Sequence, residues 1–306
     1  MSQHDMRHVR SFSAFNIQAT LPFDNLLLRF RLLRMLELRN APIDNVPKTI
    51  GVIVVSSISK LKNLQVVNCL KANDNIVRDI GNLTQLRRLE LTNVKKEDGT
   101  DLCISIENLK SLHHLLLMAS SEDEYLQIDQ LSSTPLVLRK ITLVGRLYRV
   151  PQWFNKLRNV IHLHLHWSQL AEDAIPYISE LRVLERLTLI NAYTHDKKQL
   201  SFEAGFSRLE DLYLEKFPKL VEIVISEGVM SSLARLSLHD CIKLKRVPQG
   251  IENLMNLKML NLKNVSAELV ESIRGVEGLD RSRARHIPDI RLSYVDGSEI
   301  VYENLS

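Results

Sequence analysis

Apolar side chains recur along this 306-residue chain in one short pattern, with apolar residues at positions 1, 4 and 6 and mainly polar ones at positions 3, 5 and 7. Residues 257–262 (L-K-M-L-N-L) show it, as do residues 184–189 and 209–214. Successive side chains of a β-strand point to opposite faces, so positions 4 and 6 share one face and positions 3, 5 and 7 share the other. Each copy therefore predicts a short strand with one buried face.

The copies follow one another along the whole chain. Their first residues are Val9, Leu33, Leu64, Leu86, Leu112, Leu138, Val160, Leu184, Leu209, Leu233 and Leu257. Nine of the ten steps lie between 22 and 26 residues, inside the window typical of leucine-rich repeats. The predicted fold is an α/β leucine-rich-repeat solenoid of about eleven repeats. It has a curved parallel sheet on the concave side, with short helices and irregular loops on the convex side.

The spacing also predicts how the chain is divided. Residues 1–32 are expected to form a degenerate N-terminal repeat and cap, residues 33–264 the repeat array, and residues 265–306 a C-terminal cap. The one long step, 31 residues from Leu33 to Leu64, contains a stretch at 49–59 that fits no repeat. This irregularity favours the loss of repeats at that point, through deletion or a gene-model junction.

The segments between strands carry a second pattern. Residues 150–157 and 247–254 share the phrase V-P-x-x-[F/I]-x-x-L, and residues 46–50 begin it again. Proline fixes φ and donates no backbone hydrogen bond, which suits a turn, and the apolar residues that follow are expected to close the coil over the core. Residues 171–181 and 267–274 have apolar side chains three and four apart, which predicts helices.

Composition narrows the class of protein. Residues 1–150 carry 20 basic and 15 acidic side chains and residues 151–306 carry 20 and 21, which excludes a polyelectrolyte patch for nucleic acid. Three cysteines make no disulfide framework. The polar start and the lack of an 18-residue apolar run predict no secretory signal and no transmembrane segment. We expect a cytoplasmic protein, and peripheral membrane attachment through partners stays open.

Motifs of catalysis and cofactor binding are missing. No two glycines frame G-x-x-x-x-G-K-[S/T], and no nucleophile phrase such as G-x-S-x-G occurs. The sequence predicts neither an enzyme nor a cofactor. Two charge runs, residues 121–124 and the arginines 281, 283 and 285, are expected to be solvated. The alternative is partner docking for residues 121–124 and contact to a phosphate or an acidic neighbouring domain for the arginines.

Several phrases together resemble a known family. V-P-x-W-F at 150–154, V-P-x-G-I-E-N-L at 247–254, the segment 280–288 (D-R-S-R-A-R-H-I-P) and the opening 8–12 (H-V-R-S-F) are similar to the leucine-rich-repeat region of plant disease resistance proteins, in particular the coiled-coil class of nucleotide-binding receptors. The resemblance implies a region that restrains a nucleotide switch and helps to recognise pathogen effectors or the host proteins they modify. The chain shows neither the coiled coil nor the switch module.

Candidate binding residues follow from the strand pattern, because positions 3, 5 and 7 would line the concave face. Aromatic, histidine and apolar side chains there suit protein contacts better than a purely solvated face. The partner-binding candidates are His114, Leu116, Met118, Thr142, His162, His164, His166, Trp167, Arg186, Thr188, Ile190, Asp211, Tyr213, Glu215, Arg235 and His239. The alternative is an ordinary mixed strand surface without a partner.

Three histidines on one strand allow a further alternative. His162, His164 and His166 would lie on one face roughly 7 Å apart, which could hold zinc, although adjacent same-face side chains diverge more than bonds of ~2 Å favour. They could also make binding pH-sensitive.

We therefore expect a non-catalytic protein-recognition module acting in plant defence. Its partner would be a pathogen effector, a guarded host protein or the receptor's own nucleotide-binding domain, in the last case as an intramolecular restraint. The alternatives are a general intracellular scaffold that bridges signalling proteins and, more remotely, a metal site at the three histidines.

Overall fold

The computed structural model describes residues 6–15, 30–39, 58–171, 173–194, 196–274, 278–296 and 299–305. It divides the chain into two compact units, unit 1 (Met1–Lys156) and unit 2 (Leu157–Ser306). Of the irregular stretch expected at 49–59, all but Ile58 and Ser59 lie outside the described residues.

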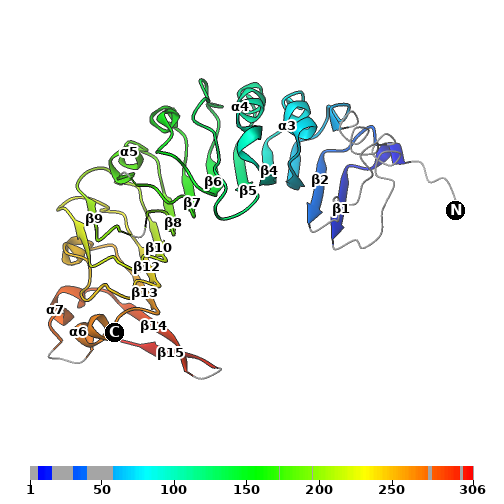
Figure 1. The fold of residues 1–306 in the computed structure, drawn as a ribbon. Coiled ribbons are helices and arrows are strands. Elements are labelled where there is room, and N and C mark those ends of the chain that lie inside the picture. Colours follow the sequence, from blue (N-terminus) through cyan, green and yellow to red (C-terminus); the bar gives the residue numbers. More distant parts are fainter. Residues whose placement is uncertain are drawn as a thin grey trace. The chain divides into compact units, whose positions relative to one another are not determined.

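Unit 1 is built on a parallel sheet whose strands follow one another in chain order (Figure 1). The strands are β1 (Ser11–Phe15), β2 (Met35–Arg39), β3 (Val66–Lys71), β4 (Arg88–Val94), β5 (His114–Ala119) and β6 (Lys140–Val144). Each begins two residues after the first residue of a repeat, as the pattern predicts. β2 pairs directly with β3 across the long step, Met35 opposite Val66.

Unit 2 continues the same arrangement in a parallel sheet of its own repeats, with a short second sheet on the other side of the coils (Figure 1). The strands of the main sheet are β7 (His162–His166), β8 (Arg186–Ile190), β10 (Asp211–Glu215), β12 (Arg235–His239), β13 (Met259–Lys263), β14 (Asp289–Asp296) and β15 (Glu299–Asn304). The second sheet pairs β9 (Gln199–Phe202) with β11 (Glu222–Ile225).

A twelfth copy of the repeat closes unit 2. β14 pairs with β13 in the common register, with Leu260 opposite Ile290 and Leu262 opposite Leu292, and Ile287 is the buried first residue of that copy. The local pattern does not reveal this copy, because it follows Leu257 by 30 residues and carries proline at position 2. β15 then pairs antiparallel to β14, so the parallel series ends there.

The core consists of the stacked apolar positions of the repeats. Leu187, Leu212 and Leu236 occupy position 4 of neighbouring strands in register and are almost completely buried. After several strands the chain turns through a residue with positive φ, for example Asn191 (47°) and Asn264 (49°). Asparagine tolerates this left-handed conformation better than most side chains, so the turn out of the strand is encoded locally.

Short helices and 3-10 turns connect many of the strands. The α-helices are α3 (Asp74–Ile80), α4 (Gly99–Asn108), α5 (Ile175–Ser179), α6 (Ala267–Ile273) and α7 (Arg281–Ala284), and the 3-10 turns are η1 (Met6–His8), η3 (Lys96–Asp98), η4 (Gln152–Lys156) and η5 (Ile251–Asn253). α5 and α6 lie inside the two segments predicted as helical. Nowhere in the described part of the chain is there a helix long and apolar enough to cross a membrane.

The two V-P phrases become η4 and η5 and close their coils as expected. Trp153 and Phe154 are buried, and the Trp153 indole N–H donates to the Ile128 carbonyl at 2.9 Å. Gly250 has a φ of +85°, and a Cβ there would lie 2.0 Å from the Ile225 carbonyl oxygen. Only glycine fits both constraints, which explains why the second phrase has glycine at its fourth position, Gly250.

The C-terminal arginines differ from the expectation of a solvated segment. Arg281 donates to the Leu305 carbonyl at 2.6 Å. Arg283 donates to Glu252 at 2.9 Å and contacts the buried carboxylate of Asp280 at 3.1 Å. Two of the three arginines therefore fasten the last coils of unit 2, because carboxylates and carbonyls buried nearby need their donors. Arg285 is exposed.

Candidate functional site

The strands of unit 2 align positions 3, 5 and 7 in three rows on one face of the main sheet, which we call the open face of unit 2. The rows run across β7, β8, β10, β12 and β13 in register. They are His162–Arg186–Asp211–Arg235–Met259, His164–Thr188–Tyr213–Ser237–Asn261 and His166–Ile190–Glu215–His239–Lys263. Strands lie about 4.8 Å apart, so neighbours in a row interact directly.

Tyr213, Glu215 and His239 form a hydrogen-bonded cluster at the centre of this face. The Tyr213 hydroxyl donates to Glu215 Oε2 at 2.5 Å and lies 2.8 Å from His239 Nδ1. Because the Tyr213 O–H is directed at Glu215, the phenol oxygen accepts a hydrogen bond from the Nδ1–H tautomer of His239. The tyrosine and histidine rings also meet edge to face, with centroids 4.8 Å apart. These half-buried side chains are held in place before any partner arrives.

The surroundings set the charge of this cluster. Burial raises the pKa of Tyr213, and the neighbouring Glu215 raises it further, so the phenol stays neutral. Burial lowers the pKa of His239 and of His166 below the ordinary histidine value, against the opposing effect of Glu215 on both. At neutral pH His166 and His239 are therefore neutral imidazoles beside Glu215.

We expect His166 and His239 to titrate below the ordinary histidine pKa of about 6.5, because burial disfavours their charged forms. The unfolded chain then binds more protons than the folded one as the pH falls, so unfolding free energy should decrease below about pH 6.5. NMR titration of the imidazole ring protons, assigned with His166→Gln and His239→Gln, measures both midpoints. Midpoints at or above the ordinary value would contradict this description of the site.

The three histidines of β7 do not converge. Their ring centroids are 6.4 Å apart between His162 and His164 and 6.3 Å apart between His164 and His166, with the planes inclined at 80° and 74°. In the part of the chain that the structure describes, no group of three or more His, Cys, Asp or Glu side chains could hold a metal ion. The geometry gives the zinc alternative no support.

The remaining candidates differ in the surface they offer. Trp167 follows β7 in the left-handed conformation, with φ of 56°, and is half-buried. In unit 1, His114 Nδ1 lies 4.0 Å from Glu90 Oε1, Leu116 is half-buried, and Met118 is 37% exposed. Thr142, opposite Leu116 in the register, is only 8% exposed and offers little area to a partner.

Unit 1 contains an aromatic pair that was not among the predicted candidates. Tyr125 and Tyr148 stack with ring centroids 4.1 Å apart and planes inclined by 13°. Lys96 lies 5.5 Å from the Tyr148 ring and Arg146 6.0 Å from the Tyr125 ring. Both tyrosines follow strands in loops that lie outside the repeat pattern. The only signal was an aromatic residue inside each of two charged loops, E-D-E-Y and R-L-Y-R.

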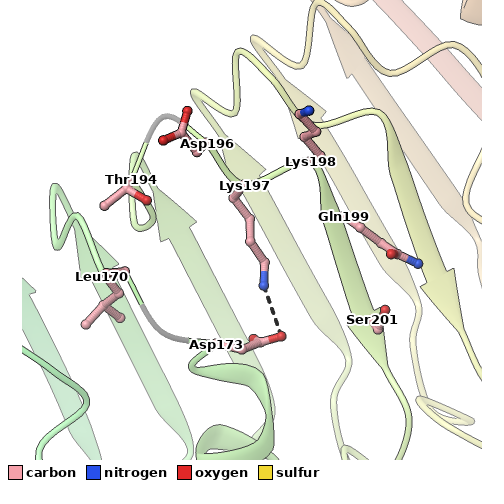
Figure 2. Close-up of a pocket in the computed structure, with 9 residues that line it drawn as sticks. Leu170, Asp173, Thr194, Asp196, Lys197, Lys198, Gln199 and Ser201 are labelled. Atoms are coloured by element: carbon pink, nitrogen blue, oxygen red, sulfur yellow. Dashed lines mark hydrogen bonds and ion pairs between the residues drawn. The ribbon is translucent and has the colours of Figure 1, made fainter.

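A pocket of about 380 Å³ lies in unit 2 around the loop before β9 (Figure 2). Lys197 points across it to Asp173, with Nζ 3.0 Å from Oδ2, and lies 5.0 Å from the Tyr193 ring. Asp196 pairs with Lys219 at 3.2 Å. Three of its four charged side chains, Asp173, Asp196 and Lys197, are thus in ion pairs, and we assign this pocket no ligand.

Comparison with known proteins agrees with the repeat pattern. The model of the leucine-rich repeat region family matches residues 43–269. Disease resistance protein RPM1 of Arabidopsis thaliana is 42% identical over 257 residues, which are 84% of this chain and 27% of that protein. Disease resistance protein RPH8A of the same plant is 25% identical over 77% of this chain and 26% of its own. A solved internalin of Listeria monocytogenes aligns with a TM-score of 0.47 at 13% identity, over 96% of this chain and 85% of that chain.

The resemblance to the leucine-rich-repeat region of plant disease resistance proteins is thereby confirmed. The chain spans about a quarter of the length of these relatives.

Proposed function

The chain belongs to the leucine-rich repeat region family, and we propose that it serves as a non-catalytic protein-recognition module in the plant defence response. Its similarity to disease resistance proteins such as RPM1 favours defence over a general signalling scaffold. The observation that carries the proposal is the cluster of Tyr213, Glu215 and His239 on the open face of unit 2.

This cluster has the properties of a binding hot spot. Tyrosine, tryptophan and arginine dominate the energetics of protein interfaces. Here Tyr213 lies diagonally opposite Arg186 on β8 and Arg235 on β12, and Trp167 directly follows β7. Side chains already held by hydrogen bonds lose little further freedom on binding. The face can therefore supply an aromatic anchor surrounded by hydrogen-bond donors and acceptors.

Three kinds of partner suit such a face: a pathogen effector, a guarded host protein and the nucleotide-binding domain of the receptor. The first two would make the module a sensor, and the third would make it an intramolecular restraint. All three encounters would take place in the cytoplasm.

Affinity capture from leaf extract tests the proposal. The combined variant His164→Ala, Trp167→Ala and Tyr213→Ala should recover the proteins captured by the natural chain at least about tenfold less efficiently, since a hot-spot residue contributes roughly 2 kcal/mol or more. Tyr177→Ala is the matched control, because Tyr177 is 50% exposed on α5, away from the main sheet (Figure 1). Equal recovery by all three proteins, with circular dichroism showing them folded, would refute this assignment.

A further inference from the structure

Positive charge gathers where the coils of unit 1 turn into their strands. The turn and the first strand residues of five successive repeats, residues 30–35, 60–66, 82–88, 108–114 and 134–140, contain no Asp or Glu. We call their cations the basic rim: Arg31, Arg34, Lys60, Lys62, Arg87, Arg88, Lys110, Arg139 and Lys140. Unit 2 has no such rim, since the equivalent turns at 180–186 and 205–211 already contain four acidic residues, Glu180, Glu185, Glu210 and Asp211.

Backbone hydrogen bonds stack the rim into one row. The Arg87 N–H donates to the Gln65 carbonyl, the His113 N–H to the Arg87 carbonyl and the Arg139 N–H to the His113 carbonyl, each at 2.8 Å. The same turn precedes β3 to β6, with N–H to carbonyl hydrogen bonds from Leu64 to Leu61, Leu86 to Leu83, Leu112 to Leu109 and Leu138 to Pro135. Strand spacing of about 4.8 Å then spreads the cations over roughly 20 Å along the row formed by the beginnings of the five strands.

Few carboxylates compensate this charge. Lys62 lies near Asp79 and Lys110 lies near Glu107. Burial acts to raise the pKa of each carboxyl, and the nearby lysine acts to lower it. Within the described ranges, no ion pair joins any of the nine rim cations to a carboxylate. All of them are exposed except Lys140, which is half-buried.

Exposed aliphatic side chains stand among the cations. Leu32 is 42% exposed next to Arg31, and Val137 and Leu136 are 39% and 74% exposed just before Arg139. Cations around aliphatic side chains are typical of surfaces that bind at the membrane interface, where the charges contact anionic headgroups and the aliphatic groups enter the boundary region.

We propose that the basic rim of unit 1 binds an anionic phospholipid surface, with Leu136 inserted between headgroups. A single sign of charge along five repeats matches a uniformly negative plane, whereas contact surfaces of proteins usually mix both signs. The rim belongs to unit 1, whereas the recognition role is assigned to the open face of unit 2. The inference thus goes beyond that role and stands without it.

Sedimentation with vesicles tests the proposal. The full chain should sediment with vesicles that contain phosphatidylserine and not with phosphatidylcholine alone. Combined Arg87→Gln, Arg88→Gln and Arg139→Gln should weaken binding roughly 100-fold, since each cation near an anionic surface contributes about a factor of five. The control removes the same charge from exposed positions of unit 2, Arg182→Gln, Arg208→Gln and Lys258→Gln, and should change binding much less.

A second pair of variants tests the aliphatic contribution. Leu136 and Met255 are both 74% exposed and both lie two residues before the first residue of a repeat, Leu138 and Leu257. Leu136→Ser should reduce vesicle binding and Met255→Ser should not.

Three outcomes would overturn the proposal: no sedimentation, equal sedimentation with both vesicle types, and equal loss in the rim and control triples. If the chain fails to sediment but is held by immobilised polyglutamate through the rim, the rim binds an acidic protein segment instead of lipid.

Discussion

Replacing Leu212 with alanine should lower the unfolding free energy of unit 2 by about 2–5 kcal/mol, the usual cost of a leucine-sized cavity in a packed core. Leu212 is completely buried on β10, between Leu187 of β8 and Leu236 of β12 in the register. Each coil of a repeat array packs only on its neighbours. The loss should therefore reach β8 and β12 as well as β10.

Chemical denaturation measures the stability change, and hydrogen exchange shows where it acts. Backbone amides of β8 and β12 should lose protection together with those of β10. Glu210→Ala serves as the control, since Glu210 is exposed and its backbone makes the repeat's hydrogen bonds whatever its side chain. Unchanged protection in the two flanking strands would contradict the nearest-neighbour description.

Asp280→Ala is expected to cost about 1.5–3 kcal/mol, because it removes hydrogen bonds to a charged group and leaves a buried N–H without an acceptor. The Asp280 carboxylate has no solvent exposure. It accepts hydrogen bonds from Arg246 at 2.6 and 2.7 Å, from Arg283 at 3.1 Å and from the Val247 N–H at 3.2 Å. Without it, the Val247 N–H is left buried without an acceptor. The residue before α7 also loses its hydrogen bonds to Arg246, in the segment that precedes β13.

The pH dependence of this contribution follows from the same contacts. Burial raises the pKa of the Asp280 carboxyl, but hydrogen bonds from Arg246, the Val247 N–H and Arg283 outweigh burial and hold it below the ordinary value. The stabilisation should be complete above the ordinary aspartate pKa of about 3.9 and disappear as the pH falls through the lower value of the folded protein.

Denaturation midpoints of the natural chain and Asp280→Asn should accordingly differ most at neutral pH and converge in acid. Glu271→Gln provides the control. Glu271 pairs with Arg274 at the surface, where ion pairs contribute little. A difference between the natural chain and Asp280→Asn that stays constant down to the lowest pH would show that the ion pairs are not its source.

The strands at the repeat positions were predicted well because their signal is local, whereas β9, β11 and β15 carry no repeat position and were not predicted. Position 1 of each repeat places the strand two residues later, as Leu209 does for β10 and Leu257 for β13. The twelfth repeat at Ile287 was missed because Pro288 and the longer step break the local pattern. α4 went unpredicted as well, although it buries Leu102 and Ile106 at helical spacing.

Side-chain contacts between one repeat and the next could not be predicted in this way. The register aligns Tyr213 with the strand that carries His239, but their hydrogen bond depends on rotamers fixed by neighbouring side chains. Arg246 and Asp280 are 34 residues apart and meet only because α7 folds back on the preceding coil. The Tyr125–Tyr148 stack joins two loops with no repeat position. The candidate face was thus predictable by residue, and its internal geometry was not.

Site-specific photo-crosslinking tests the central claim most directly, namely that a protein partner docks on the open face of unit 2. A photoreactive residue is placed at position 188 on β8, opposite Tyr213 in the register, or at position 177 on α5, and the full chain is irradiated in leaf extract. We predict a covalent adduct of a distinct partner from position 188 and none of that partner from position 177. Equal adducts from both positions, or adducts from position 177 alone, would contradict it.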